Sequence, residues 1–154
     1  MPIHAERFFT ETLRQAPWGA KVTRILAASL NAVEPGEAVR RHLIRQADTL
    51  HIAGKTYFLP DYHRIFLVGA GKAGAPMAEA IANLLPGSLA GGIVIVKEGY
   101  PANIPGIHLV EASHPIPDGR GVTGAKLMIE LLEQTRPDDL VICTISGGGS
   151  ALLT

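Results

Sequence analysis

The hydrophobic pattern of this chain changes its period several times, and each change marks a predicted element. Four short apolar runs rich in β-branched residues are typical of strands buried in a sheet: residues 65–68, 92–96, 107–111 and 140–145. Helical spacing of apolar residues follows two of these runs, from Ala75 to about Leu85 and behind Asp118. Strands that alternate with helices in this way predict an open, mostly parallel α/β sheet with helices on both faces.

The first third of the chain predicts helices and a small hairpin that precede this sheet. Two helices are expected up to about Asn31, and a third begins near Pro35. Residues 50–58 alternate about Gly54, which predicts a β-hairpin outside the main sheet. Three helices are expected to bury an apolar face: Val22, Ile25, Leu26, Leu30 and Val33 in the second, Val39, Leu43 and Ile44 in the third, and Val122, Ala125, Met128, Ile129 and Leu132 behind Asp118.

Composition narrows the class of protein. The 154 residues suffice for one domain over residues 1–154, and 47% of them are hydrophobic. The net charge of +0, without a long basic run, gives no reason to expect a nucleic-acid partner. No apolar run reaches the roughly 18 residues of a membrane span, and the start does not resemble a signal peptide. The single cysteine, Cys143, excludes an internal disulfide and favours a cytoplasmic protein, and its apolar surroundings predict an inert core residue.

A glycine-rich turn follows the first strand of the predicted sheet. Gly69, Gly71 and Gly74 have the spacing G-x-G-x-x-G, which makes the predicted sheet Rossmann-like. Glycines let the backbone approach a ligand, and the N–H groups at a helix start point towards an anion. Lys72 lies at this positive helix end, where a cation is unfavourable by about 0.3–1 kcal/mol, so a bound anion is indicated. The alternative is a tight strand–helix turn with a solvated lysine.

A second glycine loop follows the last strand. Gly147, Gly148 and Gly149 stand between Ser146 and Ser150, so that N–H groups and hydroxyls are available to phosphate or carboxylate oxygens. The alternative is a flexible turn, but three glycines lose more entropy on folding than other residues would. Both loops are expected at the carboxyl ends of strands, where open α/β sheets bind ligands.

A stiff loop with two prolines, residues 113–118, follows the third strand. His114 in this loop is a candidate to bind substrate or to transfer a proton, and the alternative is a loop histidine held by the prolines. Asp118 is expected to cap the helix behind it rather than to act as a base. Scattered histidines and a lone cysteine predict no metal site made only of protein ligands.

Nicotinamide binding is weakly supported by these residues. A dinucleotide site needs an acidic residue about 20 positions after the glycines, to hold the ribose hydroxyls. Glu98 is the only candidate near that distance, and it lies beyond its strand. A lysine inside the glycine turn favours phosphate over nicotinamide, although G-x-x-x-x-G-K-[ST] is absent from the sequence.

Three motifs in this order resemble the class II glycerate kinases, the glycerate 2-kinase family with a C-terminal MOFRL domain. They are Val-Gly-Ala-Gly-Lys-Ala at 68–73, Ser-His-Pro-Ile-Pro-Asp at 113–118 and Ser-Gly-Gly-Gly-Ser-Ala-Leu at 146–152. The resemblance covers essentially the whole chain. It implies phosphoryl transfer from ATP to D-glycerate with a divalent metal, Mg²⁺, in an active site between two domains.

The resemblance also implies a role for each matching residue. Lys72 would stabilise charge at the transferred group, and His114 and Asp118 would lie at the rim of the cleft. The phosphate or substrate loop would comprise Gly147, Gly148, Gly149 and Ser150. The family is longer than this chain and has a second domain, in which the catalytic base and the metal ligands are expected.

The chain itself ends about one turn into a predicted helix, which leaves the last strand without a cover. We therefore expect an incomplete N-terminal domain of a longer protein, and a homo-oligomer is compatible with it. Two other functions stay open at this point. One is a hydroxypyruvate reductase that uses NAD(P)H, and the other is a non-catalytic module that binds sugar phosphates.

Overall fold

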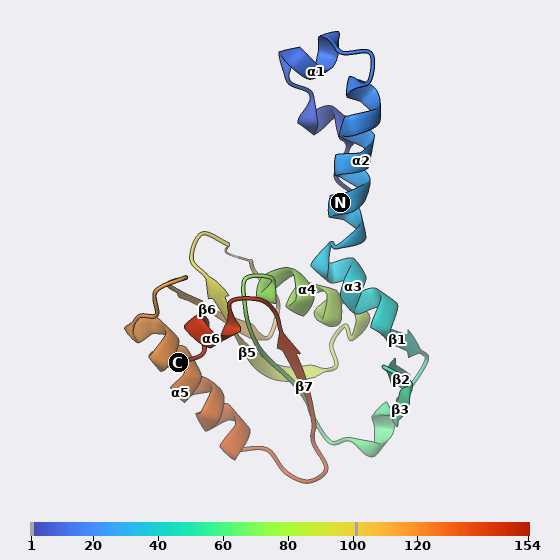
Figure 1. Ribbon diagram of the computed structural model, residues 1–154. Helices are drawn as coiled ribbons and strands as arrows, with labels where there is room; N and C mark the ends of the chain where they lie inside the picture. Colours follow the sequence, from blue (N-terminus) through green and yellow to red (C-terminus); the bar gives the residue numbers. More distant parts are fainter. Residues whose placement is uncertain (1, 101) are drawn as a thin grey trace.

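The computed structural model describes residues 2–100 and 102–154, and its main body is a four-stranded sheet (Figure 1). The strands are β4 (Ile65–Ala70), β5 (Leu89–Lys97), β6 (Ile107–Ala112) and β7 (Leu140–Ile145). Their order is β6-β5-β4-β7, and every neighbouring pair is parallel. The predicted parallel α/β sheet is therefore confirmed.

Helices cover both faces of this sheet, as predicted. The first face packs against α4 (Gly74–Leu84), where Leu67, Ile81 and Val94 are fully buried. The opposite face packs against α5 (Gly119–Glu133) and carries a smaller cluster around Ile95 and Met128. Burial of each large aliphatic side chain contributes about 1.5–3 kcal/mol, so both layers stabilise the sheet.

The connection between β5 and β6 shows why two parallel strands here need no helix between them. The six registered pairs of these strands correspond to a length of about 20 Å. Residues 98–106, if extended, span at most about 30 Å, which is enough for the return path. The described part of this link contains no helix, and the two strands are adjacent in the sheet.

A second, antiparallel sheet precedes the main one. It contains β1 (Leu43–Gln46), β2 (Thr49–Ile52) and β3 (Lys55–Phe58) in this order, followed by the short η2 (Leu59–Asp61). The predicted hairpin is β2–β3, and β1 is an additional strand. Leu43 and Ile44, predicted on one inward helical face, lie in β1, where successive side chains alternate between faces. Leu43 is therefore buried and Ile44 exposed.

The N-terminal helices extend away from the sheets (Figure 1). They are η1 (Ala5–Phe8), α1 (Glu11–Gln15), α2 (Gly19–Ala32) and α3 (Pro35–His42). We call residues 5–32 the arm. The predicted buried face of α2 is wrong, because the residues that α2 buries against η1 and α1 are Gly19, Thr23 and Ala27. The large side chains of the predicted face, from Ile25 to Val33, point to solvent.

Two further expectations about burial are wrong. The side of α5 that faces the sheet is centred on Gly121, Gly124 and Met128, so part of the predicted face lies outside it. In α5, Val122 and Ile129 are exposed, whereas Met128 is buried. Cys143 is exposed rather than part of the core, because β7 lies at the edge of the sheet and one of its faces is uncovered. On that face Ile145 is exposed as well, while Ile142 on the opposite face is buried.

Candidate functional site

The loop between β4 and α4 uses its N–H groups for bonds within the protein. The Lys72 N–H donates to the Gly147 carbonyl at 3.0 Å, and the Ala73 N–H donates to Ser146 Oγ at 3.0 Å. The N–H of Gly71 donates to the Ile95 carbonyl, and that of Gly74 to the Gly71 carbonyl, each at 3.0 Å. The first glycine loop is therefore fastened to the second one and to β5.

The three glycines of this loop allow close packing of backbone. A Cβ atom on Gly69 would lie 2.6 Å from the Thr144 carbonyl oxygen, and one on Gly71 would lie 2.7 Å from that of Ser146. Gly71 also has a φ of +137°, which side chains rarely adopt. Gly74 lets α4 approach the sheet, because a Cβ there would lie 2.9 Å from Val94 Cγ1. A contact of these glycines with phosphate stays a prediction.

The second glycine loop is the one with open donors. Gly148 has a left-handed backbone with φ 88°, and Gly149 donates to the Ser146 carbonyl at 3.2 Å. No acceptor is found for the N–H groups of Gly147 and Gly148 within residues 2–100 and 102–154. The short helix α6 (Gly149–Leu152) follows, with Ser150 exposed. N–H groups that follow one another next to a left-handed residue form a concavity suited to an anion.

Three loops meet at Gly148. A Cβ on Gly148 would lie 2.9 Å from His114 Nε2 and 3.2 Å from Lys72 Cγ, so both side chains contact this glycine. Lys72 comes from the loop after β4, His114 from the loop after β6, and Gly148 from the loop after β7. Lys72 is exposed and His114 is half-buried, so a ligand can reach both. The structure thus brings together the predicted lysine, histidine and glycine loop at one edge of the sheet.

Asp118 acts as the predicted helix cap. Its carboxylate accepts hydrogen bonds from the N–H groups of Arg120 and Gly121, at 3.1 and 3.4 Å. Arg120 also binds the Asp118 carboxylate through Nε at 2.7 Å, and this guanidinium lowers the pKa of Asp118 below its ordinary value. Arg120 Nη2 binds the Glu98 carboxylate at 2.7 Å. Asp118 and Glu98 thus share one arginine, and a place for Asp118 at the rim of a cleft stays a prediction.

Thr144 is a residue of this edge that sequence reasoning missed. It lies in β7 directly beside Gly69, only 6% exposed, and its hydroxyl has no hydrogen-bond partner in the described part of the chain. A buried hydroxyl without a partner is unfavourable, so such a group is uncommon in a folded protein. The available signal was the one hydroxyl inside an otherwise apolar run, immediately before the second glycine loop.

Residues 2–100 and 102–154 contain no group of three or more His, Cys, Asp or Glu side chains that could hold a metal ion. No helix within the same ranges has the length and apolarity to cross a membrane.

A cavity of about 560 Å³ lies between α3 and α4, and Gly148 does not line it. Glu34, Glu37 and Glu79 line it with a single arginine, Arg40, so its charge is unsuited to phosphate.

Comparisons with known proteins agree with the three motifs. Residues 21–154 match the model of a family described as "Domain of unknown function (DUF4147)". A glycerate 2-kinase of Pyrococcus horikoshii is 33% identical over 129 residues, which are 84% of this chain and 28% of that protein. A putative hydroxypyruvate reductase of Agrobacterium vitis is 42% identical over 90 residues, which are 58% of this chain and 20% of that protein.

A crystal structure of a Pyrococcus horikoshii protein has the same fold. It superposes with a TM-score of 0.76 at 33% identity and covers 84% of this chain and 29% of the other. The chain therefore spans less than a third of the length of these relatives. The resemblance to glycerate kinases is confirmed, and the chain belongs to the DUF4147 family.

Proposed function

We propose that this chain forms the lysine-bearing part of an active site that phosphorylates D-glycerate with ATP. The observation that carries the proposal is the meeting of Lys72 and His114 on Gly148, at the carboxyl edge of the sheet. Phosphoryl transfer demands little covalent chemistry from a protein, which mainly positions the groups and neutralises the charge on the transferred phosphoryl. A lysine beside open N–H groups supplies both functions.

Each group in this cluster has a role that its chemistry suggests. The Lys72 ammonium neutralises charge on the transferred phosphoryl group. The N–H groups of Gly147 and Gly148 donate to phosphate or glycerate oxygens, and Ser150 adds a hydroxyl at the same loop. His114 hydrogen-bonds the substrate or transfers a proton. The name of the P. horikoshii relative, glycerate 2-kinase, supports D-glycerate as the substrate.

ATP is proposed as the phosphoryl donor, accompanied by Mg²⁺. Mg²⁺ in such sites is usually held by substrate phosphates together with one or two carboxylates. The ammonium and N–H donors around Gly148 fit phosphate oxygens and do not fit a cation. We therefore assign the phosphate to this cluster and propose that the ligands of the ion and the catalytic base come from outside this chain.

A ligand-dependent thermal melt tests this proposal on the 154-residue chain. A ligand at 100 times its Kd adds about 2.7 kcal/mol, which raises Tm by roughly 5–10 °C for a domain of this size. D-glycerate or MgATP is expected to give such a shift, and the Lys72→Ala variant is expected to lose most of it. Lys126→Ala, an exposed lysine on α5, is the matched control and should keep the shift.

The same melt separates the alternatives. A shift with NADH, without one from D-glycerate or MgATP, would support the reductase that the name of the A. vitis relative suggests. The engagement of Glu98 with Arg120 counts against that reading, because the ribose would compete with an ion pair. A shift with a phosphosugar alone would support the non-catalytic binding module.

A further inference from the structure

The loop that carries His114, residues 113–118, has few bonds along its length. Its tip, residues 115–117, is exposed, and Ile116 keeps 75% of its surface in solvent. In the part of the chain that the structure describes, residues 114–117 neither donate nor accept a backbone hydrogen bond. The position of this loop therefore depends on what holds its two ends.

Glu98 is bonded towards both ends of the His114 loop. Its N–H donates to the carbonyl of Ala112, the residue before the loop, at 3.0 Å. Its carboxylate accepts from Arg120 Nη2 at 2.7 Å. Arg120 Nε in turn binds the carboxylate of Asp118, the last residue of the loop, at 2.7 Å. Because Glu98 directly follows β5, the strand beside β6, this anchor is attached to the sheet.

Asp118 connects the same anchor to α5. Its carboxylate accepts from the N–H groups of Arg120 and Gly121, at the start of that helix. The pKa of Asp118 is lowered first by the hydrogen bond from Arg120 and further by backbone hydrogen bonds from Ser113 and Gly121. Ser113 is the first residue of the loop, so one carboxylate joins the start of the loop, its end and the helix.

The contact between His114 and Gly148 depends on where these ends are held. β6 and β7 are the outer strands of the sheet, and three strand spacings separate them, about 14 Å in all. The loops that follow these strands must both turn towards the middle of the sheet for His114 to reach Gly148. A displacement of either end of the His114 loop would therefore open this contact.

We propose that Glu98 and Arg120 are positioning residues that hold His114 against Gly148. The proposal rests on the proposed function in one respect, namely that His114 contacts the bound ligand. The placement of His114 itself belongs to the ligand-free chain. Glu98 and Arg120 do not touch the ligand; they act through Ala112 and Asp118, which set where the loop begins and ends. A group that is already in place binds its ligand without the cost of ordering a loop.

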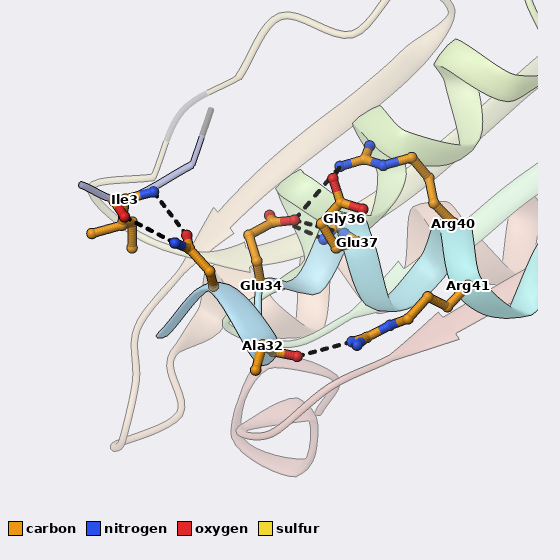
Figure 2. Close-up of polar contacts among 8 residues, drawn as sticks. Ile3, Ala32, Glu34, Gly36, Glu37, Arg40 and Arg41 are labelled. Carbon is orange, nitrogen blue, oxygen red and sulfur yellow. Dashed lines mark hydrogen bonds and ion pairs between the residues drawn. The ribbon is translucent and has the colours of Figure 1, made fainter. Parts of the chain in front are cut away.

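A second network of the same composition lies at the base of the arm (Figure 2). There Arg40 binds Glu37 at 2.8 Å and lies 3.6 Å from Glu34. Glu34 caps α3 just as Asp118 caps α5. Each network therefore contains one arginine, one capping carboxylate and one further glutamate. The network of Arg40 is a matched control, because no hydrogen bond joins it to the His114 loop among the described residues.

The nuclear Overhauser effect between His114 Hδ2 and the Gly148 α-protons, measured without ligand, tests the placement. The parent chain should show this cross-peak, because the two groups are in contact. Glu98→Ala and Arg120→Ala should each weaken it severalfold, whereas Glu37→Ala should leave it unchanged. The double variant of Glu98 and Arg120 should be no worse than Arg120→Ala alone, because both residues act in one network. A parent chain without the cross-peak, or a cross-peak that Glu98→Ala leaves intact, would overturn the proposal.

A thermal melt with D-glycerate or MgATP tests the consequence for binding. Exposed ion pairs contribute little to stability, and the Glu98 side chain is 54% exposed, so Glu98→Ala should keep the ligand-free Tm of the parent chain. The rise in Tm with ligand should nevertheless shrink in this variant and stay intact in Glu37→Ala. A residue with a merely structural role would instead lower the ligand-free Tm and leave the rise unchanged.

The two measurements together separate this proposal from the proposed function. A rise in Tm that Glu98→Ala keeps in full, although the cross-peak is lost, would overturn the role of Glu98 and Arg120 in binding. A parent chain that shows the cross-peak but no rise with D-glycerate or MgATP would contradict the proposed function. In that case the cross-peak of Glu98→Ala still decides whether this network places His114.

Discussion

The two ends of the strand pair β4–β7 are fastened in opposite ways. At the amino end, Arg64 Nε and Nη2 bind the two oxygens of Asp139, at 3.0 and 2.6 Å. The Asp139 side chain is 0% exposed, and it also accepts the Arg136 N–H at 2.8 Å. Arg64 Nη2 reaches the Gln134 carbonyl as well, at 2.9 Å. One charged pair, together with the backbone groups that bond to it, therefore closes this end.

At the carboxyl end the fastening uses neutral bonds between two glycine loops. The N–H groups of Lys72 and Ala73 donate to the loop that follows β7. Gly71 brings the two backbones so close that there is no room for a Cβ. The N–H groups of Gly147 and Gly148 are left with no acceptor from the described residues.

The contrast explains why this end is suited to bind a ligand. At the amino end, the Arg64 and Asp139 charges neutralise each other and their further bonds go to the backbone of Gln134 and Arg136, so this end presents no unpaired charge to a ligand. Glycine loops hold each other by their backbones, so they can be rigid and still present N–H groups outward. The first loop therefore supports the second, which presents the open N–H groups.

The largest effect is expected from breaking the close approach at Gly71. Gly71→Ala places a methyl group against the Ser146 backbone at a φ of +137° and should cost about 2–5 kcal/mol of unfolding free energy. Gly147→Ala is the matched variant, since nothing lies within 4 Å of its Cβ position, and it should change stability by less than about 0.5 kcal/mol. Urea denaturation of both variants measures the difference. Equal stabilities would mean that the loops do not support each other as described.

The charged end should give the protein an acid-sensitive part of its stability. The hydrogen bond from Arg64 is the main cause that lowers the pKa of Asp139 below its ordinary value. A carboxyl group with a lowered folded pKa stabilises the fold above its unfolded pKa of about 4, and this contribution is lost as the pH falls through the lower folded value. Asp139→Asn should therefore lower Tm at neutral pH. It should also make the fall of Tm with decreasing pH less steep below about pH 4.

The neighbouring carboxylate supplies the control for this pH profile. Asp138 is exposed, and Asp138→Asn should leave the acid limb of the profile close to that of the parent chain. Some slope should persist in Asp139→Asn, because the pKa of Asp118 is also lowered, through Arg120. An unchanged acid limb in Asp139→Asn would show that this pair does not fasten the amino end.

The smallest effect is expected at Thr144, on the carboxyl end. Its hydroxyl lacks a partner in the described structure, so Thr144→Val should be neutral or stabilise the fold by up to about 1 kcal/mol. Denaturation of the ligand-free chain measures this change, with Thr123→Val, an exposed threonine on α5, as the comparison. A loss of more than about 1 kcal/mol would mean that the hydroxyl makes a bond that the fold needs.

Local sequence was enough for the main elements and for much of the candidate site. Short apolar runs identified β4 to β7, and the position of Asp118 before a helix identified its cap. Glycine spacing after two strands, together with the rule that ligands bind at the carboxyl edge, put Lys72 and Gly148 in one region. These inferences succeed because strand burial, helix capping and turn conformation depend on residues close in sequence.

Other features depend on contacts between residues far apart in the chain, and the sequence alone left them undecided. Ala73 lies 73 residues from Ser146, and Arg64 lies 75 residues from Asp139, yet each pair forms a hydrogen bond. The apolar residues of α2 from Ile25 to Val33, and the face of β7 that carries Cys143, have patterns typical of buried faces, yet both are exposed. A sequence pattern does not show whether another layer packs against such a face. The sequence determined which residues form helices, strands and glycine loops, because local interactions decide those. Only the tertiary structure decided which loop keeps its N–H groups open and which apolar faces stay uncovered, because both depend on what packs against them.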